Sequence, residues 1–338
     1  MIAGSDKSVC RCCRKTFVKS LERPSEACRT LPALVKYLMI SLLIGGAFTK
    51  AHNQFNISGA TTGTKNATMI QPTKPKATDE PALFYEVLTR SLKKRKTTLA
   101  QICPQTDLVA RRILEEYGAI FVATRKVKTP PVCLFTSEAQ VAKWQDEADY
   151  ITETISYADV ELQPEAMKAL LKARKEALKE GLDITPRDGA EAARRSYEDS
   201  MHLWDTRFLP ALDYWLAQGR LTEEQVARLK NLPLHQQIAE VLELEKSGVY
   251  FSKDLSKSIL YSIAAPGASQ HIAMLAFDVS EFDNPRVREI LARHGWFQTV
   301  LSDLPHFTFL GLKEKDLPKN GLKSVVVDGQ TFWIPNVP

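Results

Sequence analysis

The chain has few histidines and few cysteines. It contains six of each in 338 residues. Four of the cysteines, Cys10, Cys12, Cys13 and Cys28, lie near the start of the chain, without the paired C-x-x-C spacing and partner histidines of a zinc finger. This spacing argues against a zinc finger at the N-terminal end.

The body of the chain also has no excess of either charge. Residues 1–36 hold eight Lys/Arg and three Asp/Glu, which accounts for the whole formal net charge of +5. The remaining residues hold 37 basic and 37 acidic side chains. Because nucleic-acid-binding domains have clustered basic charge, we expect no nucleic-acid partner.

A long membrane-spanning run is missing, but a shorter apolar run follows the basic head at 1–36. Tyr37–Phe48 is uncharged and has the length of a signal-peptide core, so we expect 37–51 to be a signal peptide or a membrane anchor. An uncleaved anchor needs the run to extend back to Leu31, across Pro32 and Lys36. Either route predicts a periplasmic or extracellular protein, tethered to the inner (cytoplasmic) membrane if the segment stays.

The segment that follows, 52–80, is rich in Thr, Asn, Lys and Pro and is predicted to be a flexible linker. Beyond it lie the last two cysteines, Cys103 and Cys133. In an oxidising compartment they are expected to form a disulfide. By closing a loop of about 30 residues in the unfolded chain, it would stabilise the fold by about 3 to 4 kcal/mol. Two buried free thiols are the alternative.

From residue 81 the pattern becomes globular. Helices are predicted over 165–179, over 223–229 after a Thr222/Gln225 capping box, over 237–247 and over 284–294, and Val109–Ala123 is predicted to be a short helix followed by a strand. Strand-like segments gather in the last 90 or so residues, at 272–279, 306–312 and 323–334. We therefore expect an α+β fold with a small, mostly antiparallel sheet, a large helical portion and an N-terminal helical insertion. The expected regions are an N-terminal α/β subregion, 81–160, and a site-bearing domain, 161–338.

One candidate site begins in "APGASQHIAMLAFDVSEF", Ala265–Phe282. Asp278 sits in an apolar run, where a carboxylate is costly to bury without a compensating charge such as a metal ion. On a straight strand His271 and Asp278 face opposite ways, and on a helix they lie about 10 Å apart. A bend between them is therefore required, with the chain extended from Met274 onward.

A second part of the site lies in "LSDLPHFTFLGL", Leu301–Leu312. Pro305 excludes a helix, and the alternation of His306 with Phe307 predicts a strand whose aromatic face is buried and whose other face carries the histidine. Asp303 lies on the loop that enters this strand. Two histidines and one carboxylate would leave the fourth position of a zinc ion open, as catalysis requires.

These residues resemble two motifs of the zinc D-alanyl-D-alanine carboxypeptidases and dipeptidases of bacterial cell walls, a family with a hedgehog-type fold. The S-x-H-x-x-G-x-A-x-D motif is matched by Ser269, His271, Ala276 and Asp278, and the E-x-x-H motif by Asp303 and His306. The chain departs from the family in three places: Met274 replaces glycine, Asp303 replaces glutamate and Pro305 replaces an aromatic residue. It is similar to a divergent member.

The resemblance implies a role for each site residue. His271, Asp278 and His306 bind Zn²⁺, and Asp303 is the base that takes a proton and returns it to the leaving amine. Arg195, followed by Ser196 in "RRSYEDS", contacts the substrate or its oxyanion, and Arg187 is an alternative for that role. Ser269 positions the first ligand or the substrate.

The expected function is zinc-dependent hydrolysis of D-alanyl-D-alanine or related peptide bonds in peptidoglycan stem peptides. A zinc-holding, weakly catalytic or non-catalytic peptidoglycan-binding protein is the alternative, and an exported helical interaction protein with a chance motif is the third. The sequence leaves open whether a carboxypeptidase, a dipeptidase or an endopeptidase bond is cut. Because 76 residues separate Arg195 from His271, a helical insertion that includes residues 202–221 is expected between two parts of the site.

Overall fold

The structure, a computed structural model, describes residues 82–301 and 303–338. These residues fall within one compact unit, Thr73–Pro338. Three predicted regions lie wholly outside the described residues: the head, 1–36, the signal peptide or anchor, 37–51, and the linker, 52–80. The same holds for Cys10, Cys12, Cys13 and Cys28. Among the helices that are described, none combines the length and hydropathy that a bilayer span needs.

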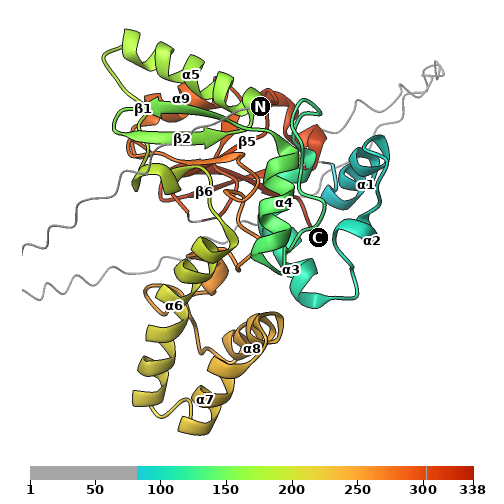
Figure 1. The fold of residues 1–338 in the computed structure, drawn as a ribbon, viewed down its shortest axis with the longest axis vertical. Coiled ribbons are helices and arrows are strands. Elements are labelled where there is room, and N and C mark those ends of the chain that lie inside the picture. Colours follow the sequence, from blue (N-terminus) through green and yellow to red (C-terminus); the bar gives the residue numbers. More distant parts are fainter. Residues whose placement is uncertain (1–81, 302) are drawn as a thin grey trace, which may run out of the picture. The chain divides into compact units, whose positions relative to one another are not determined.

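The described part is an α+β fold of helices and three small antiparallel sheets (Figure 1). The helices are α1 (Phe84–Lys94), α2 (Leu99–Ile102), α3 (Leu108–Tyr117), α4 (Glu138–Ala148), α5 (Pro164–Lys179), α6 (Tyr197–Ala217), α7 (Glu223–Asn231), α8 (Leu234–Lys246) and α9 (Pro285–Arg293). The strands are β1 (Ile151–Ile155), β2 (Ala158–Leu162), β3 (Ala276–Asp278), β4 (Trp296–Phe297), β5 (His306–Phe309), β6 (Leu322–Val327) and β7 (Gln330–Pro335). The sheets are β1-β2, β3-β5-β4 and β6-β7, so the expected fold class is confirmed.

Local sequence signals set several helix ends. The capping box of Thr222 and Gln225 is formed at the start of α7. Asn284 caps α9 by accepting the backbone N–H of Arg286 at 2.9 Å, and Pro285 takes the first helical position. Each of these helices begins where an unpaired N–H group finds a side-chain acceptor.

The prediction for Val109–Ala123 was half right. The helix is present as α3, but the apolar run that follows it is a 3-10 helix, Gly118–Val122, not a strand. All five of its residues are buried, and a side chain at Gly118 would press on Phe84 and Leu114. Because a short apolar run that is buried on every side has no periodicity, the sequence does not distinguish a strand from a tight helical turn there.

Two hydrophobic cores hold the fold together. The larger one contains residues of α1, α5, β3 and β5, on both sides of position 160, so the two predicted subregions share it. The smaller one lies in and around the helical lobe, by which we mean α6, α7 and α8, which lie together and apart from the sheets (Figure 1). The helical insertion expected between Arg195 and His271 is thus present as α6, α7 and α8.

The disulfide predicted in the globular part is present. Cys103 and Cys133 are joined, with 5.3 Å between their Cα atoms. The second cysteine leads into Phe135, whose backbone N–H donates to the carbonyl of Gly267 at 3.0 Å. The segment that follows the disulfide is therefore hydrogen-bonded to the segment that leads into His271.

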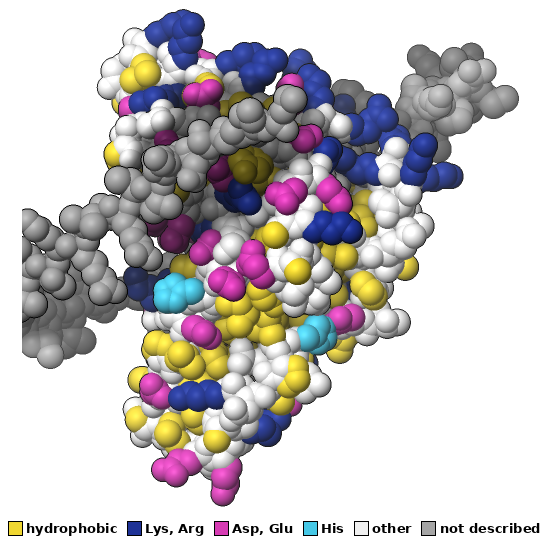
Figure 2. Space-filling model, in the orientation of Figure 1, with side chains coloured by type: hydrophobic (Ala, Val, Ile, Leu, Met, Phe, Trp, Pro, Cys, Tyr) yellow, Lys and Arg dark blue, Asp and Glu magenta, His cyan; other side chains and the backbone are white. Residues whose placement is uncertain are grey.

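The balanced charge of the body conceals an uneven distribution. On the face shown in Figure 2, Lys and Arg side chains gather over α5 and beside α1, whereas acidic and apolar side chains mix over the helical lobe. On this face, basic side chains are therefore concentrated away from the helical lobe.

Candidate metal centre

Two neighbouring strands bring Asp278 and His306 together. Asp278 is the last residue of β3, His306 is the first residue of β5, and the antiparallel register places the two directly opposite each other. Directly opposed residues of a sheet project from the same face with their Cβ atoms about 5 Å apart. The alternation expected from the sequence therefore gives the correct face for both side chains.

The bend that the sequence requires between His271 and Asp278 is present at Met274. The backbone N–H of Met274 donates to the carbonyl of His271 at 2.9 Å, and Met274 has a φ of 53°. This left-handed conformation favours glycine, the residue that the resembled motif has at this position. The turn directs His271 back toward the carboxylate at the end of β3.

Three ligand atoms converge at this point. The Nε2 atom of His271 lies 3.0 Å from Nδ1 of His306, and each of them lies 3.2 Å from Oδ1 of Asp278. Ligands of a tetrahedral zinc ion, with bonds of about 2.0 to 2.1 Å, are separated by roughly 3.3 Å. The triangle of donor atoms thus has nearly the size of one face of a zinc tetrahedron. We call these three side chains the donor triangle.

Hydrogen bonds behind the triangle fix which imidazole nitrogens carry protons. Nδ1 of His271 lies 2.8 Å from the carbonyl oxygen of Ala193, and Nε2 of His306 lies 2.9 Å from Oε1 of Gln270. Because both partners are acceptors, these nitrogens are the donors. The nitrogens that face Asp278 therefore carry lone pairs in the neutral imidazoles.

The orientation of Gln270 is itself fixed. Its Nε2 donates to the carbonyl of Tyr117 at 2.9 Å, and its Oε1 also accepts a hydrogen bond from the hydroxyl of Thr308. Thr299 lies 2.6 Å from the same hydroxyl. Since a carbonyl accepts only, the amide cannot turn round, and its oxygen must face His306.

The donor triangle is buried and rich in lone pairs. His271, Asp278 and His306 are at most 8% exposed. Burial, followed by the charge of Arg195, lowers the pKa of His271 to about 4. Burial alone would raise the pKa of Asp278, but protonated imidazole facing it, His271 first, and the positive charge of Arg195 outweigh burial and hold that pKa well below its usual value. Three unprotonated ligand atoms that face one point are a site that could hold a metal ion, and two nitrogens with one oxygen suit zinc.

Arg195 lies against the triangle. Its Nη2 is 2.5 Å from Oδ2 of Asp278, and both side chains are about one-tenth exposed. Its Nε donates to the carbonyl of Glu191 at 2.8 Å. The guanidinium occupies the outer oxygen of Asp278 and leaves the inner oxygen to face the imidazoles.

Arg187 and Ser269, the other two residues predicted to contact the substrate, have different surroundings. The side chain of Arg187 lies over the ring of Phe282, 5.3 Å from its centroid, and its backbone N–H donates to the carbonyl of Asp278. Of the two candidate arginines, it is thus Arg195 whose side chain reaches the triangle. Ser269 Oγ accepts the backbone N–H of His271 at 3.3 Å, a contact that holds the first histidine in its turn.

Asp303 borders the same small cavity as His271, His306 and Arg195. Burial raises its pKa to about 6; the Asp278 carboxylate adds to this rise, while His306, Arg195 and Arg187 oppose it. A carboxyl group that titrates near neutral pH can both accept and return a proton. The cavity has a volume of about 20 Å³, enough for about one water molecule.

Three further residues of this site were not singled out from the sequence. Gln270 and Thr308 support His306 from behind, and Tyr117 borders the cavity. Thr308 follows His306 by two residues, and the alternation of the predicted strand already places it on the face of the histidine, although not as a support of that residue. No comparable signal marks Gln270 or Tyr117.

No family model matches the chain, and no curated protein does. A search of solved structures finds similarity to a zinc complex of a variant of the vancomycin resistance D,D-pentapeptidase VanY from a VanB-type resistance cassette. The identity is 16%, the match covers 49% of this chain and 82% of that chain, and the TM-score is 0.29. Because so low a TM-score does not establish a shared fold, the function of this site must be inferred from its own geometry.

Proposed function

We propose that the chain is a zinc-dependent hydrolase of D-alanyl-D-alanine or related peptide bonds in cell-wall stem peptides. The observation that carries the proposal is the donor triangle, whose three lone-pair atoms lie 3.0 to 3.2 Å apart. The other ring nitrogen of each histidine donates a hydrogen bond to an acceptor behind the triangle. The order of Ser269, His271, Asp278, Asp303 and His306 along the chain, which resembles the motifs of such enzymes, supports the same reaction class.

The residues divide the work of hydrolysis. When bound, a zinc ion supplies a Lewis acid and lowers the pKa of water. Asp303, at the edge of the cavity, takes a proton and returns it to the leaving amine, for which a pKa of about 6 is suitable. Arg195 places positive charge beside the cavity, where a developing oxyanion needs it.

The location that we propose agrees with this substrate. Export through the segment 37–51, with the chain held at the inner membrane or released, would bring the site to peptidoglycan stem peptides. The linker at 52–80 would let the globular part reach the cell wall.

The test uses the purified full chain. Zinc content is measured by elemental analysis, and release of D-alanine from a stem pentapeptide is measured with and without a chelator. We expect about one zinc ion per chain and activity that the chelator removes. His306→Ala should lose the zinc, whereas His294→Ala, a change at a half-buried histidine that pairs with Glu176, should keep it. Activity that persists in the chelator would exclude the metal mechanism.

A second function is favoured by one observation. Arg195 is already paired with Asp278 and the cavity has room for about one water molecule, as would suit a protein that holds zinc and binds peptidoglycan but hydrolyses it poorly. Asp303→Asn separates the two functions, because the enzyme would lose D-alanine release while keeping its zinc. The binding protein would release little D-alanine with or without that substitution, and Asp283→Asn, an exposed aspartate outside the cavity, is the matched control.

A further inference from the structure

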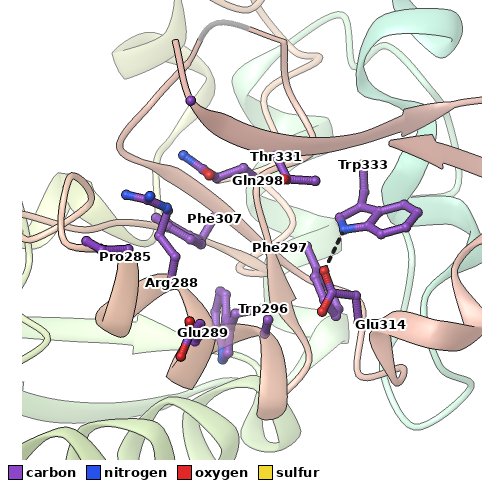
Figure 3. A pocket seen from close by; sticks show the side chains of 12 residues that line it. Pro285, Arg288, Glu289, Trp296, Phe297, Gln298, Phe307, Glu314, Thr331 and Trp333 are labelled. Atoms are coloured by element: carbon purple, nitrogen blue, oxygen red, sulfur yellow. Dashed lines mark hydrogen bonds between the residues drawn. The ribbon is translucent and has the colours of Figure 1, made fainter. Parts of the chain in front are cut away.

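A second pocket lies between α9, β4 and the β6-β7 hairpin, with a volume of about 230 Å³. None of the residues that line it lines the cavity at the donor triangle. Figure 3 shows aromatic side chains, among them Phe297 and Trp333, together with the polar ends of Arg288 and Gln298 around it. It is therefore a separate candidate binding site.

Gln298 gives this pocket an unused hydrogen-bond acceptor. The residue is 3% exposed, and its Nε2 donates to the carbonyl of Leu304 and to Oε1 of Gln330, both at 2.6 Å. Both amide hydrogens are thus engaged, which fixes the orientation of the amide. Its Oε1 accepts no hydrogen bond from any residue between 82 and 338 that the structure describes. Because Gln298 lines the pocket and its amide orientation is fixed, this oxygen is available to accept a hydrogen bond from a ligand hydroxyl or N–H group.

Arg288, which also lines the pocket, supplies hydrogen-bond donors. Its Nη1 donates to the carbonyls of Phe282 and Asp283 at 2.9 and 2.8 Å, so the guanidinium is held in place by the backbone. Arg288, Gln298 and Phe307 all line the pocket, and their side chains are labelled in Figure 3. A ligand that lies between Arg288 and Gln298 would meet a fixed donor and a fixed acceptor together.

Trp333 supplies an aromatic flank. Its indole is only partly buried, and its Nε1 donates to Oε1 of Glu314 at 3.2 Å, the bond that is dashed in Figure 3. The opposite end of the pocket carries Glu289, which pairs with Arg286 at 2.7 Å. The lining therefore combines one guanidinium, two carboxylates, an amide and an aromatic face.

This combination selects a class of ligand. Two carboxylates beside a single arginine disfavour a phosphate or a polyacid. Hydroxyl groups both donate and accept hydrogen bonds, and the C–H face of a sugar ring packs on an aromatic ring. Pockets for drug-sized ligands are about 300 to 1,000 Å³, so a pocket somewhat below that range suits a single ring.

We propose that this pocket binds one neutral pyranose ring, such as the N-acetylated amino sugar of a glycan strand. The inference does not rest on the proposed hydrolysis, because it uses no residue of the donor triangle. It adds a glycan contact to a protein that we propose acts on the peptides of the same polymer.

The test measures binding of N-acetylglucosamine and of its β-1,4-linked trimer to the full chain by saturation-transfer NMR and calorimetry. We expect binding of the trimer that weakens roughly tenfold or more in Trp333→Ala and in Arg288→Met, since aromatic and arginine contacts dominate such sites. Trp215→Phe, a change at a tryptophan of the helical lobe, should leave the affinity unchanged.

Each outcome decides the inference. Absence of binding, or equal binding by both pocket variants, overturns it, and if Trp333→Ala does not fold, Arg288→Met decides alone. Binding of a stem pentapeptide in place of the sugar at this pocket also overturns it. Because the sugar should bind equally well after zinc has been removed with a chelator, failure of the hydrolase proposal and failure of this one are distinguishable.

Discussion

The side-chain oxygen of Gln270 lies 2.9 Å from Nε2 of His306 and holds that imidazole with its Nδ1 lone pair facing Asp278. Gln270 contacts none of the three ligand atoms themselves, but it determines which tautomer of His306 is present. Substitution of a residue that supports a metal ligand in this way typically lowers metal affinity.

Gln270→Leu should therefore weaken zinc binding by about 10- to 100-fold, because His306 loses the acceptor that fixes its tautomer. Zinc affinity is measured by competition with a chromophoric chelator, and the tautomer by ¹⁵N chemical shifts of the histidine side chains. Gln237→Leu is the matched control, since Gln237 is a buried glutamine of the helical lobe that pairs with Trp204. Unchanged zinc affinity in a folded Gln270→Leu protein would show that the amide has only a packing role.

At Met274, substitution by glycine should destabilise the protein less than substitution by alanine, which is the reverse of the usual order. The left-handed φ of 53° costs a side chain about 1 kcal/mol, whereas loss of a buried methionine side chain costs about 2 to 5 kcal/mol. Both Met274→Gly and Met274→Ala should lower the free energy of unfolding, but alanine should lower it more because only glycine relieves the backbone. Met167, buried in α5, is the control: there glycine should be the worse of the two by about 1 kcal/mol. The measurement is denaturant unfolding of all four variants, and the same order at both positions would refute the strain.

Removal of Arg195 should destabilise the zinc-free protein. Arg195→Met leaves the buried carboxylate of Asp278 without its cation, a change that costs about 3 kcal/mol when one partner of a buried pair is lost. Adding Asp278→Asn should restore much of that loss, because no charge then remains unpaired. Zinc should reduce the effect of Arg195→Met, since the ion compensates the same carboxylate. An equal loss of unfolding free energy with and without zinc would contradict this account.

The stability of the helical lobe should depend on the ionisation of one carboxyl group, that of Glu245. Burial raises the pKa of Glu245, although the hydroxyl of Ser258 and the N–H groups of Ile259 and Phe251 oppose the rise. The folded-state pKa of Glu245 lies above the ordinary value of 4.5. The contribution of protonated Glu245 to the free energy of unfolding is therefore complete below pH 4.5 and is lost as the pH rises through the folded-state pKa.

Glu245→Gln should remove that decline while its amide oxygen still accepts the N–H of Ile259. Free energies of unfolding are measured at pH 4.5 and at pH 7.5, and the difference between the two should be smaller in the variant than in the original protein. Glu243→Gln, at an exposed position of the same helix, should not change it. A variant with the original pH dependence would assign the effect to another carboxyl group.

Sequence patterns were sufficient where the cause is local. The capping box at Thr222, the strand after Pro305 and the required bend near Met274 all depend on residues a few positions apart, and all are present. The hairpin β1-β2 was not predicted, although the burial of Ala158, Val160 and Leu162 alternates with more exposed residues as a strand requires.

The supporting contacts of the site could not be predicted from local patterns. Gln270 is held by the carbonyl of Tyr117, 153 residues away in the sequence, and His271 by the carbonyl of Ala193, 78 residues away. A backbone carbonyl carries no residue-specific signal, so only the folded chain shows which one serves a given histidine. The choice between Arg187 and Arg195 depended on the fold for the same reason.

Met274 also bears on how relatives of such chains can be recognised. A bulky side chain here fills the interior while its backbone adopts an angle that glycine accepts without strain. A sequence pattern that requires glycine at this turn would not match this chain, although its backbone has the φ that glycine favours. A filter based on the sign of φ at this turn, with residue identity left free, would retain chains with either residue.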